Sequence, residues 1–74
     1  MTQSLVLIQG KNVKEQNLHI SLQNALQLII GSAPGFGIVL HIAADTPEYL
    51  EKALIAFAMV PKVTGVVTLM IRTT

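Results

Sequence analysis

The clearest periodic pattern in the chain runs from Asp45 to Val60 and predicts an amphipathic helix. Asp45 or Thr46 can cap its N-terminus, and Pro47 suits the first helical turn because proline has no amide to satisfy. Pro61 ends the helix, since proline removes an amide donor and disfavours helical geometry in the residue before it.

Ile55 and Met59 fall on the side of this helix that should face solvent. The opposite, core-facing stripe consists of Leu50, Ala53, Leu54, Phe57 and Val60. A surface helix of a monomer normally carries polar side chains at such outward positions, although single exposed apolar residues are common. The pattern favours a partner subunit over this helix, with Ile55 and Met59 in the interface.

Runs rich in aliphatic and β-branched residues predict strands at residues 4–9, 37–43 and 65–73. Alternate residues of a strand point to opposite faces of its sheet. The face towards the helices should carry Ile38, Leu40 and Ile42 from the second run and Val67, Leu69 and Ile71 from the third. The opposite face should carry Val39, His41, Ala43, Val66, Thr68 and Met70, with His19 as a further candidate.

The segment between the first two runs has two interpretations. Residues 22–30 have the apolar spacing of a helix, with Ser21 as its N-cap and Gly31 after its last turn. Residues 17–21 alternate apolar and polar side chains, which favours a strand in a hairpin with the first run. An early start of the following helix is the alternative for residues 13–20.

Together these elements predict an α/β (α+β) fold, a single domain over residues 1–74 with the order β(β)αβαβ. Right-handed crossovers place two helices on one face of a three- or four-stranded sheet, which gives a two-layer sandwich. Nothing in so short a chain is left to cover the other face of that sheet.

Composition adds a reason to expect self-association. Hydrophobic residues make up 51% of the chain and charged residues 12%, well below the usual quarter. A chain of 74 residues has a marginal core, and without cysteine no disulfide can reinforce it. A homo-oligomer, most simply a dimer, would cover the excess apolar surface. The lack of cysteine also fits a cytoplasmic protein.

Two partner classes are disfavoured. The net charge is +1 with scattered charges, and the aromatic residues number three, so nucleic-acid binding is not expected. Residues 16–44 contain no charged side chain, but glycines and Pro34 interrupt this stretch, so no membrane span is expected. The first ten residues lack the basic start and cleavage site of a signal peptide.

The pattern predicts no catalytic, cofactor or metal site. His19, His41 and Arg72 are the candidates for a ligand pocket on the uncovered sheet face, although polar positions on a half-exposed sheet explain both histidines more simply.

The leading hypothesis is therefore a non-enzymatic protein-interaction or accessory module that forms a homo-oligomer. Its interface would be either the helix residues Ile55 and Met59 or the sheet residues Val39, His41, Val66, Thr68 and Met70. The alternatives are a small-molecule sensor or small enzyme with a site at the subunit boundary near His19 and His41, and an adaptor that binds another protein through the sheet face or a free strand edge.

From Gly37 onward the chain resembles two families: the ligand-sensing domain of leucine-responsive regulators, and the small chaperone that binds signal peptides of periplasmic nitrate reductase. The resemblance rests on a strand, a helix capped by residues 46–48, Val60-Pro61, Gly65-Val66 and a final strand. It implies a ferredoxin-like or related fold. It covers about half of the chain and contains no functional signature, and residues 62–64 interrupt the shared turn, so no residue roles carry over.

Overall fold

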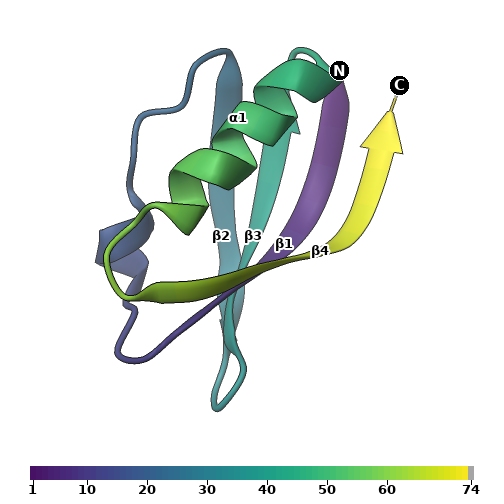
Figure 1. Ribbon diagram of the computed structural model, residues 1–74. Coiled ribbons are helices and arrows are strands. Elements are labelled where there is room, and N and C mark those ends of the chain that lie inside the picture. Colours follow the sequence, from purple (N-terminus) through teal and green to yellow (C-terminus); the bar gives the residue numbers. More distant parts are fainter. Residues whose placement is uncertain (74) are drawn as a thin grey trace.

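A four-stranded antiparallel sheet with an α-helix across one face forms the structure, a computed structural model that describes residues 1–73 (Figure 1). The elements in chain order are strand β1 (Thr2–Gly10), 3-10 helix η1 (Glu15–Leu18), strand β2 (Ala25–Ala33), strand β3 (Gly37–Ala44), helix α1 (Pro47–Ala58) and strand β4 (Val63–Thr73). The strand order is β2-β3-β1-β4, so β1 and β3 are central and β2 and β4 form the edges.

The hydrophobic core lies between α1 and the side of β1 and β3 that faces it. Alternate residues of these two strands are buried, as expected for strands with one covered face. The buried apolar residues are Val6, Ile8, Leu18, Ile38, Leu40, Ile42, Ala44, Leu50, Ala53 and Phe57. The predicted orientation of Ile38, Leu40 and Ile42 towards the helix is confirmed.

Helix α1 begins where its capping signal predicts. Thr46 Oγ1 accepts a hydrogen bond from the backbone N–H of Tyr49 at 3.3 Å, and Pro47 is the first helical residue. Met59 is the C-cap, so the helix ends two residues before Pro61. The predicted helix at residues 45–60 is confirmed with slightly shorter bounds.

The predicted helix at residues 22–30 is wrong, because residues 25–33 form β2 and pair with β3. The hairpin turn brings the two strands together: the Phe36 N–H donates to the Ala33 carbonyl at 2.8 Å, and Gly35 has a φ of +83° that favours glycine. Backbone pairing with β3 then satisfies the amides and carbonyls of this segment that point towards β3. Ser21 is exposed and precedes no α-helix.

The predicted strand at residues 17–21 is wrong as well. Residues 11–24 form a connection that contains η1 and runs beside α1 (Figure 1). Leu18 is fully buried in the core, and its carbonyl oxygen accepts a hydrogen bond from Gln27 Nε2 at 2.7 Å. Leu18, Ile20 and Leu22 therefore pack in the layer where a second helix was expected.

These two corrections change the fold class. The order is β1-β2-β3-α1-β4 with one α-helix in residues 1–73, and the ferredoxin-like β(β)αβαβ sandwich with two helices on one sheet face is contradicted. The physical reason is the β2–β3 hairpin, which joins antiparallel neighbours directly and leaves no crossover for a first helix.

A bulge at Leu69 changes which side chains of β4 face each side of the sheet. Val66 and Thr68 lie opposite buried residues of β1, on the side of α1, whereas Val67 and Met70 lie on the other side. The sequence alternation predicted the reverse for Val66, Val67 and Thr68, because an extra residue in a strand is invisible in the alternation itself.

Candidate interaction surface

The sheet face turned away from α1, called here the open face, carries apolar side chains from all four strands. Residues directly opposite one another in the register share a face, so the pairings define rows across the sheet. In the order β2, β3, β1, β4, the rows are Leu26, Ala43, Gln3 and Arg72; Leu28, His41, Leu5 and Met70; and Gly31, Val39, Leu7 and Val67. The middle row is apolar apart from His41.

The edge strands leave this face accessible to solvent. In β2, Leu26 is 78% and Leu28 is 62% exposed, and in β4 Met70 is 48% exposed. Their neighbours Leu5 and Leu7 in the central strand β1 are half-buried. Contiguous apolar patches larger than a few hundred Å² are uncommon on monomeric proteins and mark interaction sites. The open face is therefore the candidate functional surface of the molecule.

The polar groups of the open face are few and partly paired with one another. His41 Nε2 lies 3.1 Å from Gln3 Oε1, a hydrogen bond in which the imidazole N–H donates to the amide oxygen. Arg72 lies opposite Gln3 on the edge strand β4, in the same row. Arg72 and His41 are thus the side chains in the three rows that can carry a charge.

The residues predicted for a sheet interface divide between the two faces. Val39, His41 and Met70 lie on the open face, whereas Val66 packs against the core and Thr68 lies on the side of α1. Sequence reasoning missed several open-face residues, namely Leu5, Leu7, Leu26, Leu28 and Val67. For Leu5 and Leu7 the signal was present, since they alternate with Ser4, Val6 and Ile8 in the first predicted strand.

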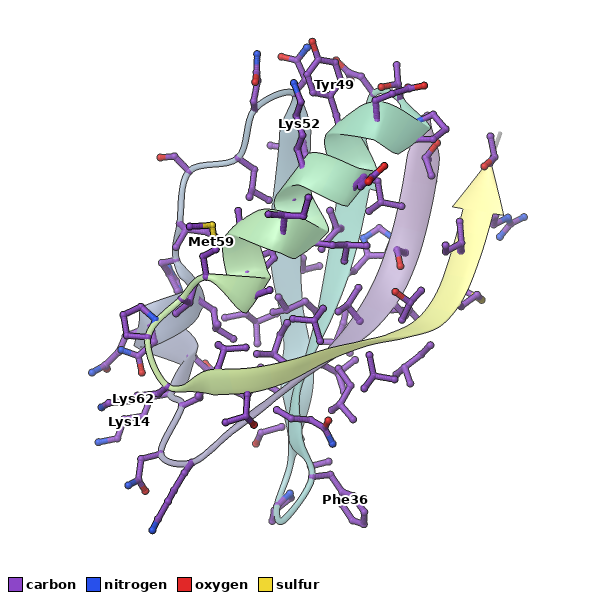
Figure 2. The ribbon with its side chains drawn as sticks, in the orientation of Figure 1. Lys14, Phe36, Tyr49, Lys52, Met59 and Lys62 are labelled. Carbon is purple, nitrogen blue, oxygen red and sulfur yellow. The ribbon has the colours of Figure 1, made fainter. Side chains whose placement is uncertain are left out.

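The second predicted interface lies on α1. Ile55 is 53% and Met59 is 77% exposed, so both side chains face outward, as the helical pattern predicted. Figure 2 shows Met59 at the C-terminal end of α1, away from Tyr49 and Lys52 in the first turns. There the Lys52 ammonium lies 5.3 Å from the centroid of the Tyr49 ring, a cation–π distance. The apolar patch on α1 is thus confined to its last turn and a half.

The three residues predicted for a ligand pocket do not gather in one place. His41 and Arg72 lie on the open face on either side of Gln3. His19 follows η1, in the connection on the helix side, and is exposed. A hollow of about 530 Å³ lies elsewhere, between the β2–β3 hairpin tip and the ends of β1 and β4. It is lined by Gln9, Gly10, Val13, Thr64 and residues 32–38, and includes none of the three.

Comparison of the chain with protein-family models, with curated proteins and with solved structures finds no significant match in any of the three. Within residues 1–73, no helix is long and apolar enough to cross a membrane. The same part of the chain contains no group of three or more His, Cys, Asp or Glu side chains placed to hold a metal ion.

Proposed function

We propose that this chain is a non-enzymatic protein-interaction module that acts as a homodimer, with a second copy packed on the open face of its sheet. The observation that supports the proposal is the set of apolar side chains across all four strands, among them the exposed Leu28 and Met70 and the half-buried Leu5. Two sheets that pack face to face bury their inner side chains in a shared core, as in β-sandwiches.

The size of the open face limits how tightly a second copy could bind there. Strands lie about 4.8 Å apart and rise about 3.3 Å per residue, so four strands over the seven paired residues of β1 and β3 span roughly 19 by 23 Å. That is about 400 Å² per copy before the relief of the side chains is added, or about 800 Å² for two copies. Stable interfaces begin near 1,000 Å² in total, so a dimer formed by the open face alone lies below that size and should be weak.

The patch on α1 is a weaker candidate for the main interface. Ile55 and Met59 are two side chains one turn apart on a single helix, whereas the open face offers four strands. An interface needs a contiguous buried centre surrounded by a rim, and two side chains cannot supply both. The α1 patch therefore provides a matched control for the sheet.

The one arginine of the open face, Arg72, does not prevent two copies from packing on each other. Arg72 stands near one end of an edge strand, at a corner of the face. A two-fold axis through the centre of the face, either along or across the strands, therefore keeps the two guanidinium groups apart. Like charges that are separated in this way and exposed at a rim are screened by salt and cost little.

The test compares two lysine substitutions at similarly exposed leucine and isoleucine positions. Leu28→Lys inserts a charge in the middle row of the open face, and Ile55→Lys inserts the same charge on α1. Both side chains are more than half exposed, so each change should alter monomer stability by less than about 0.5 kcal/mol. Sedimentation velocity should show a dimer for the unmodified chain and for Ile55→Lys, and a monomer for Leu28→Lys.

The opposite result, a monomer for Ile55→Lys and a dimer for Leu28→Lys, would move the interface to α1. A monomer for the unmodified chain up to hundreds of micromolar would contradict self-association and would leave the open face for a different protein. Circular dichroism of each variant would establish that the fold is retained.

A further inference from the structure

His41 stands near the centre of the proposed interface. It belongs to the middle row of the open face, between Leu28 of β2 and Leu5 of β1, with Val39 and Ala43 as its neighbours along β3. None of these four side chains contains a hydrogen-bond acceptor. A second copy on the open face would therefore remove the imidazole from water and surround it with apolar groups.

His41 has one hydrogen-bonding partner among the described residues. Nε2–H donates to Gln3 Oε1 at 3.1 Å, and Nδ1 has no partner within residues 1–73. Gln3 is held in turn, because its amide nitrogen lies 4.0 Å from Met1 Sδ. Protonation would add a second donor at Nδ1, and a buried donor without a partner is costly. In the free chain water can accept that hydrogen bond, but in the covered face it could not.

Within residues 1–73, the open face has no anionic side chain that could stabilise a protonated His41. The facing side chains of β1 and β2 are uncharged, and β4 contributes Arg72, which repels a cation. Asp45, the nearest acidic residue along the chain, lies in the turn before α1, and Glu48 and Glu51 belong to the other layer.

We propose that His41 makes this self-association sensitive to pH, so that acid separates the two copies; the inference rests on the proposed dimer. The sign follows from linkage: a covered face disfavours the imidazolium, so the free chain binds more protons than the dimer does, and lowering the pH favours the free chain. Each dimer contains two such histidines, so two protons enter the linkage.

The change of the dissociation constant with pH has an upper limit. If both copies must be neutral to associate, two protons are released on association, and acid then raises the dissociation constant by at most about 100-fold for each unit that the pH is lowered. His19 is the other histidine of the chain and is therefore the side chain to control for.

The experiment measures the dimer dissociation constant by sedimentation equilibrium at about pH 7.5 and about pH 5.5 for three chains. The dissociation constant of the unmodified chain should be tens of fold higher at the lower pH. His41→Gln, which keeps a polar side chain near Gln3 but cannot be protonated, should lose this dependence. His19→Gln removes the exposed histidine on the helix side and should keep it.

The possible failures are distinguishable. A chain that is monomeric at pH 7.5 contradicts the dimer itself. A dimer whose dissociation constant is the same at both pH values overturns the role of His41, and so does a His41→Gln variant that keeps the full pH dependence. A partial pH dependence that remains in His41→Gln comes from other groups and can be subtracted.

Discussion

Replacing Gly37 by alanine should destabilise the protein strongly. Gly37 is the first residue of β3 and lies against the backbone of β1, where there is no room for a side chain. Gly37 has a φ of +148°, a backbone conformation that residues with a Cβ rarely adopt. A Cβ built there would overlap the Ile8 carbonyl oxygen and lie 3.1 Å from Leu7 Cδ1. The next residue starts the pairing of β3 with β1, as Ile38 opposite Ile8.

The expected loss has two parts. The unfavourable φ costs about 1–2 kcal/mol for a residue with a Cβ. Displacing the Ile8 backbone resembles overpacking of a core, which costs about 1–3 kcal/mol. Together they predict a loss of about 2–5 kcal/mol, against a total stability of roughly 4–11 kcal/mol for a chain of this length. The loss is therefore a large share of the total, and at the low end of the stability range the mutant would be unfolded at 25 °C.

Gly31→Ala is the matched control in the neighbouring strand. A Cβ at Gly31 meets nothing within 4 Å, and its φ is not positive, so alanine there should stabilise β2 by about 0.5–1 kcal/mol. Urea denaturation followed by circular dichroism, at a concentration low enough to keep the chain monomeric, gives both free energies of unfolding. Equal stabilities for Gly37→Ala and Gly31→Ala would refute the close approach of β3 to β1, and with it the register that defines the open face.

Two further predictions test the helix and the connection. Thr46→Ala should lower the free energy of unfolding by about 1 kcal/mol, because it removes the hydrogen bond that caps the Tyr49 N–H. Ser21→Ala, at an exposed position that caps no α-helix, should change the free energy of unfolding by less than about 0.5 kcal/mol. Similar losses for the two variants in chemical denaturation would contradict the observed secondary structure. Leu18→Ala should lower the free energy of unfolding by about 2–5 kcal/mol, because the Leu18 side chain is fully buried. Leu26→Ala should leave the stability of the monomer almost unchanged, because Leu26 is 78% exposed. If Leu18→Ala left the stability unchanged, the connection would not pack on the core.

Helix α1 and three of the strands could be predicted from local signals. The helix carries a complete start signal in Thr46 and Pro47 and a stop in Pro61, and its apolar residues recur at helical spacing. The strands β1, β3 and β4 are runs of aliphatic and β-branched residues bounded by glycine or by turn formers. Where local propensity and tertiary packing agreed in this way, the sequence was sufficient.

Strand β2 could not be predicted because both of its faces are apolar. Ala25 and Ile29 face the helix side, and Leu26 and Leu28 lie on the open face. Had the open-face positions been polar, the strict alternation of a half-buried strand would have been visible. With leucine at those positions, the same residues also satisfy a helical stripe, and leucine, glutamine and alanine favour helices. The leucines that suggest a partner for the open face are therefore the same residues that made β2 resemble a helix in the sequence.

The residues of the open face could be predicted only in part from the sequence, for a related reason. Which side chains share a sheet face depends on register, and a single extra residue at Leu69 reverses the alternation in β4. Strand order is equally invisible in the sequence: β1 lies between β3 and β4 through contacts between distant parts of the chain. Val39, His41 and Met70 were assigned to the open face correctly, but the leucines that extend it required the structure.

Molecular mass in solution tests the central claim most directly, namely that a second copy covers the open face. Light scattering of the unmodified chain at neutral pH, over a series of concentrations into the hundreds of micromolar, should show the mass rising to twice the 8.0 kDa of one chain. A mass that stays at 8.0 kDa throughout the series would contradict the homodimer.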